Sequence, residues 1–261
     1  DFQDPWTQVD YYKFLKLTRW ADRKHRKMEQ EVFKTANKIT IASPSWKTDI
    51  EKIGAKNVDV IFWGYDEDDF QFPAKSFDSK FTVVHAGMLG YDRNPEIFFS
   101  VLKQLKNELE GFSQNLEIRL AGPVDFSVKK SLENNGLAEN TIYLGTVKRP
   151  IVLQTIASAH IQLLPLNIAD NAKGRIPGKL FENIRVQRPI LCLGPINSDV
   201  SGIIAETGSG ESFLYQDFDG IKKFVEKRYK LFLQGENKVN ASAYIQYSVE
   251  KIGRASCRER V

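Results

Sequence analysis

From about residue 80 onward, short apolar runs alternate with longer amphipathic segments, and this alternation constrains the fold more than any other feature. Six runs predict strands: FTVVHAG, LEIRLAG, TIYLG, HIQLLPL, RPILCLG and the short ESFLY. Between them, segments such as NPEIFFSVLKQLKNELE and RPIVLQTIASA have the spacing of helices. Strands that are apolar throughout and alternate with helices are typical of a parallel sheet covered on both faces. The pattern predicts a doubly wound α/β domain, which binds its ligands at the carboxyl ends of the strands.

The composition is that of a folded chain without a membrane span. The 261 residues are 42% hydrophobic, which is enough to bury a core. The longest apolar runs, such as FTVVHAGML, have the length of strands and are too short to cross a bilayer, and no signal pattern opens the chain. Cys192 and Cys257 make neither a metal-binding spacing nor a disulfide framework. We therefore expect a soluble, cytoplasmic protein.

The two ends of the chain are unusual. The last ten residues, IGRASCRERV (252–261), resemble the translation of a DNA sequencing adapter, and the chain begins at DFQDPW without an initiator methionine. Without those ten residues the formal net charge falls from +4 to +2, so the basic balance says little about partners. We expect no nucleic-acid partner, and we expect a fragment that lacks sequence at both ends.

A second α/β unit precedes the doubly wound domain. Residues 38–64 contain the apolar runs KITIAS and VDVIFWG on either side of a helical stretch from about Ser45 to Ile53. The polar segment that follows, GYDEDDFQFPAKSFDSK, is acidic at its start and contains a proline, which favours a hinge. The predicted units are the end of a truncated first domain (1–66), a hinge (67–79), the doubly wound domain (80–235), a C-terminal helix (236–251) and the adapter-like residues (252–261).

Basic residues dominate an amphipathic helical pattern that runs from Tyr11 to Lys38. It contains nine lysines and arginines and three acidic residues. Such a face is compatible with simple solvation, and it also suits a surface that rests on anionic lipid headgroups. The sequence leaves both interpretations open.

Glycines end three of the predicted strands: Gly87 and Gly90 in HAGMLGYDRNP, Gly122 in LAGP and Gly145 in YLGTV. Glycine lets backbone N–H groups approach a ligand without a clashing side chain. The first turn is no dinucleotide fingerprint, because a third glycine is missing and the helix begins only after Pro95. Each turn taken alone is compatible with a purely structural role.

The stretch KGRIPGKLFEN, residues 173–183, has the features of an anion site. A glycine turn and a proline precede a helix start, with Arg175 and Lys179 beside it. The turn before another helix also carries a cation, Arg93. Two cationic turns at one edge of a sheet suit a diphosphate, because guanidinium supplies paired donors and ammonium a point charge. The domain is therefore predicted to bind a nucleotide, and a solvated helix start is the simpler alternative.

The order of these segments resembles a known family. The first strand and its glycine turn, then LAGP, YLGTV, HIQLLPL and GRIPGKLFENIRVQRPILCLG, resemble the nucleotide-sugar domain of GT-B glycosyltransferases, in particular the retaining family 4. DFQDPW, KMEQEVFKTANKITIAS and VDVIFWGYDEDDF resemble the end of that family's acceptor domain. The resemblance covers about residues 1–250. It implies a Rossmann-like GT-B fold in which the first half of the acceptor domain is absent.

By this resemblance, Glu182 holds the ribose of the donor, and Arg175 and Lys179 are the catalytic cations at the diphosphate. Gly174 stands where the family has an earlier glutamate that contacts the donor sugar, and Met88 stands where it commonly has an arginine. The other implied contacts are Gly87, Gly90, Arg93, Gly122, Val147 and Gly178 on the donor side and Asp4 and Trp6 on the acceptor side.

The implied activity is the transfer of a sugar from a nucleotide diphosphate-sugar to a glycan or lipid-linked acceptor, with retention, in polysaccharide biosynthesis of a bacterial type. Neither a metal nor a cofactor is expected, because cations and backbone amides would stabilise the leaving diphosphate. We expect the fragment alone to be inactive, and the enzyme to lie in the cytoplasm or against the inner face of the membrane. Two rivals stay open: a nucleotide-sugar epimerase of the same fold, and a non-catalytic nucleotide-binding module.

Overall fold

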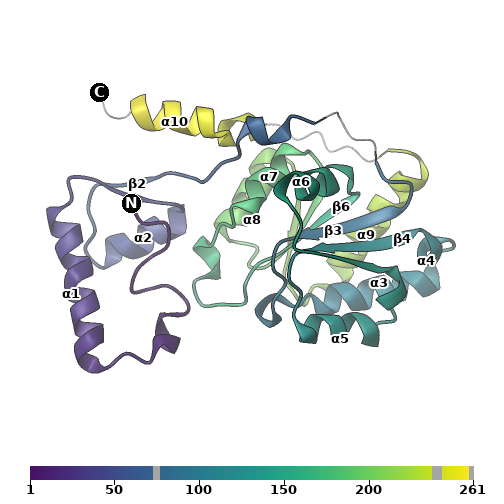
Figure 1. Cartoon of the computed structure of the whole chain (residues 1–261), viewed down its shortest axis with the longest axis horizontal. Coiled ribbons are helices and arrows are strands. Elements are labelled where there is room, and N and C mark those ends of the chain that lie inside the picture. The colour runs from purple at the N-terminus through teal and green to yellow at the C-terminus, as the bar shows by residue number, and fades with distance from the viewer. Residues whose placement is uncertain (73–76, 237–242, 259–261) are drawn as a thin grey trace.

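The structure is a computed structural model that describes residues 1–72, 77–236 and 243–258. Figure 1 shows two unequal parts joined by an extended segment, with the smaller part at the left. The smaller part contains α1 (Arg19–Thr35), β1 (Ile39–Ile41), α2 (Pro44–Lys52) and β2 (Val58–Val60). The larger part is the predicted doubly wound domain, and its sheet lies in the middle.

Six parallel strands form the sheet of the larger part, in the order β5-β4-β3-β6-β7-β8. They are β3 (Phe81–Ala86), β4 (Leu116–Ala121), β5 (Thr141–Gly145), β6 (Ile161–Pro165), β7 (Ile190–Leu193) and β8 (Gly210–Phe213). All six predicted strands are confirmed. The order reverses between β3 and β6, which pair at Val83 with Ile161 and at Val84 with Gln162. Doubly wound sheets bind their ligands at the carboxyl ends of the strands beside such a reversal.

Helices cover both faces of this sheet. One face packs against α3 (Glu96–Glu108), α4 (Phe112–Asn115), α5 (Phe126–Asn134) and α9 (Phe218–Leu233), and the other against α6 (Arg149–Ser158), α7 (Lys179–Arg185) and α8 (Asp199–Thr207). Ile161 and Leu163 of β6 join the core on the side of α3 and α9, whereas Leu164 joins the core beside α7 and α8. Because successive strand side chains point to opposite faces, apolar residues at every position provide two cores.

The basic helix is shorter than the pattern from Tyr11 to Lys38 predicts. α1 begins at Arg19, because the Thr18 side chain accepts a hydrogen bond from the Ala21 N–H and so caps the helix. Before it, a single 3₁₀ turn at Tyr12–Leu15 is followed by Lys16, whose φ of 48° is left-handed and breaks the helix. The predicted helix therefore has an irregular first third.

Three predicted segments lie partly outside the described residues: the hinge at 73–76, the C-terminal helix at 237–242 and the adapter-like residues at 259–261. In the hinge, Glu67–Phe70 forms a 3₁₀ turn, η2. In the C-terminal segment another 3₁₀ turn covers Tyr244–Tyr247, and α10 (Val249–Arg258) begins later than predicted. No helix in the described ranges is long and apolar enough to cross a membrane.

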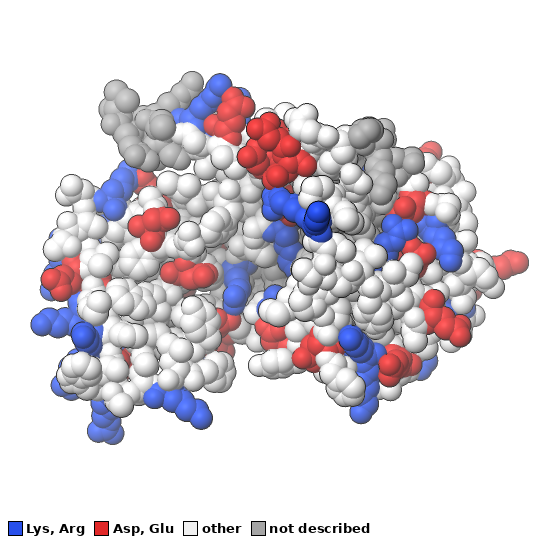
Figure 2. Space-filling view, in the orientation of Figure 1, with Lys and Arg blue, Asp and Glu red and all other residues white. Residues whose placement is uncertain are grey.

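The two parts meet where α2 faces α8 and the loop before α7. The N–H and hydroxyl of Ser45 donate to the Asp199 carboxylate at 2.9 and 2.7 Å. The indole of Trp46 covers Gly174 so closely that a Cβ there would overlap the ring. Elsewhere the surface between the parts is hollowed, and Figure 2 shows Lys and Arg side chains gathered in this hollow.

Candidate functional site

Lys179 places its ammonium at the carboxyl end of β3, beside the reversal of strand order. It is the first residue of α7, and its Nζ donates to the carbonyl oxygen of Ala86 at 2.9 Å. Burial, together with the positive charge of Arg93, lowers the pKa of Lys179 to about 8. No carboxylate of the described residues pairs with this ammonium. A half-buried cation in that state suits an anionic ligand, because a ligand charge restores the stabilisation that burial removes.

The predicted glycine turns come together beside Lys179. The side chain of Lys179 lies against Gly87, where an added Cβ would stand 2.9 Å from Nζ. Gly122, with a φ of 131°, packs so closely that a Cβ would overlap the carbonyl of Gly87, and its N–H donates to Gly145 at 2.8 Å. These contacts give Gly122 a packing reason of its own, and the N–H of Gly87 likewise donates within the chain, to Ala121 at 2.7 Å.

Glu182 lies one turn along α7 from Lys179, on the same side of the helix. Its side chain is 16% exposed, and its Oε1 accepts from Nη2 of Arg149 at 2.7 Å. Burial raises the pKa of Glu182 above its ordinary value, and the Arg149 charge opposes that rise. The Glu182 carboxylate, paired with Arg149, thus stands beside the Lys179 ammonium, which has no carboxylate partner among the described residues.

The other predicted cations are held by carboxylates. Arg175 donates to Asp10 at 2.6 Å, across the contact between the two parts. Arg93 pairs with its neighbour Asp92 through two bonds of 3.1 and 3.0 Å. Arg175 must leave Asp10 before it can serve a ligand fully, whereas Lys179 needs no such exchange.

Asp4 and Trp6 lie in a different cavity. It has a volume of about 660 Å³, is formed within the smaller part by the N-terminal residues and α1, and contains neither Lys179 nor Glu182. The Trp6 ring lies 5.9 Å from that of His25. Of the remaining predicted contacts, Val147 is half-buried and Gly178 is exposed.

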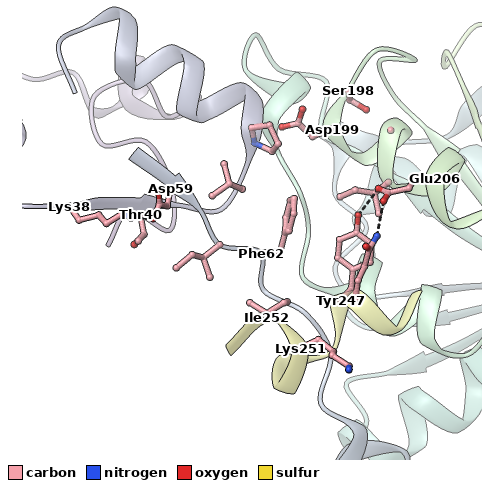
Figure 3. Close-up of a pocket in the computed structure, with 16 residues that line it drawn as sticks. Lys38, Thr40, Asp59, Phe62, Ser198, Asp199, Glu206, Tyr247, Lys251 and Ile252 are labelled. Carbon is pink, nitrogen blue, oxygen red and sulfur yellow. Dashed lines mark hydrogen bonds and ion pairs between the residues drawn. The ribbon is translucent and has the colours of Figure 1, made fainter. Parts of the chain in front are cut away.

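A cavity of about 820 Å³ lies between the smaller part and α8, and Figure 3 shows it. Its lining includes the carboxylates of Asp199 and Glu206, and neither is free. Glu206 accepts a hydrogen bond from the Tyr247 hydroxyl at 2.9 Å, and Asp199 accepts two from Ser45. Lys179 does not line this cavity.

Titratable clusters give no second site in the described part of the chain. No group of three His, Cys, Asp or Glu side chains there is arranged to hold a metal ion. His85 of β3 is buried with its Nδ1 3.0 Å from the Leu163 carbonyl oxygen, and burial lowers its pKa to about 3. It is therefore a neutral core residue at ordinary pH.

Sequence reasoning missed Arg149 and Asp10 as neighbours of the site. Arg149 had a signal, because it stands directly before Pro150 at the start of a helix that follows YLGTV. A basic residue close to a proline before a helix is also the feature that marked KGRIPGKLFEN. Asp10 had no local signal, since its partner lies 165 residues away in the sequence.

No protein-family model matches the sequence, and no curated protein sequence matches it. Solved structures do match. HepE of Anabaena, in complex with UDP, has a TM-score of 0.69 at 13% identity, covering 94% of this chain and 69% of HepE. TarM of S. aureus, in a complex that includes UDP, gives 0.65 at 12% identity over 90% of this chain and 46% of TarM. WaaG, a glycosyltransferase involved in lipopolysaccharide biosynthesis, gives 0.62 at 15% identity over 93% of this chain and 68% of WaaG.

The chain has the GT-B glycosyltransferase fold. The fold predicted by the resemblance is confirmed, and assignment to family 4 stays a prediction. The chain spans 46% to 69% of the length of the three GT-B proteins compared.

Proposed function

We propose that this chain belongs to an enzyme that transfers a sugar from a nucleotide diphosphate-sugar to a glycan or lipid-linked acceptor, with retention and without a metal ion. The observation that carries the proposal is the Lys179 ammonium, which lies at the carboxyl end of β3 beside Glu182 and pairs with no carboxylate of the described residues. UDP in the HepE and TarM complexes supports a nucleotide ligand. The role of WaaG in lipopolysaccharide biosynthesis supports a glycan or lipid-linked acceptor.

Lys179 acts on the leaving group. Cleavage of the bond between sugar and phosphate leaves negative charge on the diphosphate, and a fixed cation stabilises that charge more in the transition state than in the ground state. The arriving diphosphate also raises the pKa of Lys179 from about 8, so the ammonium stays charged when it is needed. Arg93 adds positive charge nearby, and Arg175 joins when it leaves Asp10.

Glu182 holds the nucleotide. Its carboxylate accepts hydrogen bonds from the ribose hydroxyls, which change little during the reaction. Such bonds stabilise the ground state and the transition state alike, so they set affinity rather than turnover. Glu182→Gln is therefore expected to weaken nucleotide binding while leaving kcat nearly unchanged.

The test compares Lys179→Ala with Lys173→Ala, an exposed lysine on the same turn. Binding of UDP is measured by calorimetry on this chain, and turnover on the protein from the complete gene. Loss of the Lys179 cation should raise the activation free energy by about 3 kcal/mol, whereas Lys173→Ala should behave as wild type. A folded Lys179→Ala protein with wild-type turnover and affinity would exclude the proposed donor site.

The same assay separates the rival functions. Transfer of labelled sugar to an acceptor supports the transferase, an altered free sugar supports the epimerase, and binding without either product supports the non-catalytic module. Activity should survive EDTA, because the proposed site uses cations of the protein in place of a metal. Loss of turnover on chelation, restored by a divalent cation, would contradict metal independence.

We propose further that these 261 residues bind the nucleotide and do not transfer sugar alone, since the chain spans 46% to 69% of the compared proteins. Robust transfer by this chain would contradict that expectation.

We also propose peripheral contact with an anionic membrane at the cytoplasmic face. Phe14 and Trp20 are each 71% exposed, with the ammonium of Lys13 over one ring and that of Lys24 over the other. Exposed aromatics beside cations suit the headgroup region. Sedimentation with anionic vesicles should show salt-sensitive binding that Trp20→Ala weakens. Equal binding to neutral vesicles would contradict an electrostatic contact.

A further inference from the structure

Arg149 lies between two carboxylates that come from different elements. It is the first residue of α6, and its Nη2 donates both to Glu182 of α7, at 2.7 Å, and to Asp69 of η2, at 2.6 Å. Its Nε also donates to Asp69, at 3.1 Å. The guanidinium thus connects η2 to the Glu182 carboxylate. η2 belongs to the hinge between the two parts (67–79), which is called the linker below.

We propose that Arg149 is a positioning residue of the donor site: anchored by Asp69, it orients the Glu182 carboxylate and keeps it ionised for the ribose hydroxyls. The inference rests on the ribose-binding role proposed for Glu182. It adds a residue that touches no reacting atom and acts through another side chain.

The electrostatic surroundings of Glu182 show why it needs such a partner. Burial is the largest influence and favours the neutral acid, and the negative charge of Asp69 acts in the same direction. Arg149 and, more weakly, Lys179 favour the carboxylate. A neutral Glu182 would lose much of its power to accept from two hydroxyls, because an ionised acceptor makes stronger hydrogen bonds than a neutral one.

Asp69 anchors Arg149, and the linker holds a second arginine through a different residue. The same 3₁₀ turn, η2, binds a second arginine, because Glu67 accepts from Arg185 at 2.9 Å and Phe70 lies under its guanidinium. Arg185 is on α7 and belongs to the linker contact, but it contacts no carboxylate of the donor site. It is therefore a matched control, because its loss removes one arginine from the linker contact without removing the Arg149 contacts with Asp69 and Glu182.

The experiment is calorimetric titration of UDP into the wild-type chain, Arg149→Gln, Arg149→Lys and Arg185→Gln, at several pH values from mildly acidic to mildly alkaline. Loss of Arg149 should raise the pKa of Glu182 further and so move the acid limb of UDP affinity to higher pH, with about a tenfold loss of affinity on the acid side. The loss should shrink as pH rises, because Glu182 ionises again.

The variants have distinct expected profiles. Arg149→Lys should recover part of the shift, because it restores the charge but not the two-sided geometry of the guanidinium. Asp69→Asn should weaken binding less than Arg149→Gln. Arg185→Gln should keep the wild-type acid limb even if its Tm falls, since it changes only the linker.

The outcomes separate the inference from the proposed function. A folded Arg149→Gln protein whose acid limb matches wild type, while Glu182→Gln weakens binding, would overturn the inference alone. A shift of the same size in Arg185→Gln would also overturn it, because the linker and not the contact with Glu182 would then be responsible. Failure of the wild-type chain to bind UDP would contradict the proposed function, and the inference with it.

Discussion

The two parts of the molecule differ in how they are held together. The larger part has a six-stranded sheet with a core on each face, so most of its stability arises within it. The smaller part has a two-stranded sheet, β1 with β2, and one small core around Phe33, Trp46 and Ile50. A two-stranded sheet is marginal without further packing. We infer that the smaller part depends on its contacts with the larger part for stability, whereas the larger part does not depend on the smaller.

The proposed nucleotide site lies in the larger part. Lys179, Glu182 and Gly87 belong to this part, whose sheet has a core of its own on each face. The smaller part contacts the larger part through Asp10 and Trp46, which lie against the loop before α7.

The largest effect is expected in the core of the larger part. Phe98 is buried between α3 and the sheet. Phe98→Ala should lower the free energy of unfolding by about 4 kcal/mol. Phe33→Ala should instead release the smaller part, seen as proteolysis within residues 1–60 while UDP binding persists. Denaturant unfolding followed by both probes would measure this. Equal loss of the larger part in Phe33→Ala would show that the two parts unfold together.

Gly174→Ala should be the next largest effect. A Cβ at Gly174 would overlap Trp46, so the contact between the parts must shift, at about 2 kcal/mol. Gly178→Ala is the control, because an added Cβ there meets nothing within 4 Å and its φ is ordinary. Proteolysis rates should therefore rise for the first variant only. A Gly174→Ala protein as resistant as wild type would show that Trp46 accommodates the methyl group.

The nucleotide affinity of the larger part should depend on pH through Lys179. Its pKa is lowered to about 8 without ligand, and a bound diphosphate raises it, so binding takes up a proton above that pH. UDP affinity should fall about tenfold as pH rises from about 7 to about 9. Lys179→Ala is the control, because any ionisation of the nucleotide itself appears in both proteins. A parallel decline in the two proteins would remove Lys179 from the explanation.

The lowered pKa of Lys179 also affects the free energy of unfolding, which should change with pH in the opposite direction to UDP affinity. In the unfolded chain Lys179 binds its proton up to its ordinary pKa of 10.5, so between about 8 and that value the unfolded state holds more protons. The contribution of Lys179 to the free energy of unfolding should therefore rise with pH across that window. Denaturant unfolding of wild type and Lys179→Ala at both ends of the window would measure it, and a constant difference between them would contradict the shifted pKa.

The smallest effect is expected from the ion pairs between the parts. Asp10 and Arg175 are 15% and 32% exposed, so a double-mutant cycle should give a coupling of about 1 kcal/mol. Lys13 and Asp170 pair over the same loop but are 58% and 88% exposed, and their coupling should be near zero. Equal couplings would mean that burial does not decide the strength of these contacts.

The sequence was sufficient to predict the doubly wound sheet. Its six strands appear as short apolar runs, and the central strands β3, β6 and β7 are buried at nearly every position, whereas β4 alternates and the edge strand β5 is mostly exposed. The sequence also indicated that a cation and a carboxylate lie together on one helix, because Lys179 and Glu182 are three residues apart and so lie on the same side of α7. Such features depend on local spacing, which a sequence displays directly.

Which charged side chains lack a carboxylate partner, in contrast, depends on the tertiary fold. Arg175 and Lys179 look equivalent in KGRIPGKLFEN, yet one is paired with Asp10 and the other has no carboxylate partner among the described residues. Arg149 reaches Glu182 only because α6 and α7 pack side by side on one face of the sheet. Asp69, which accepts from Arg149, is 80 residues away from it in the sequence. Pairings of this kind depend on the order in which the strands assemble, so no local pattern of residues contains them.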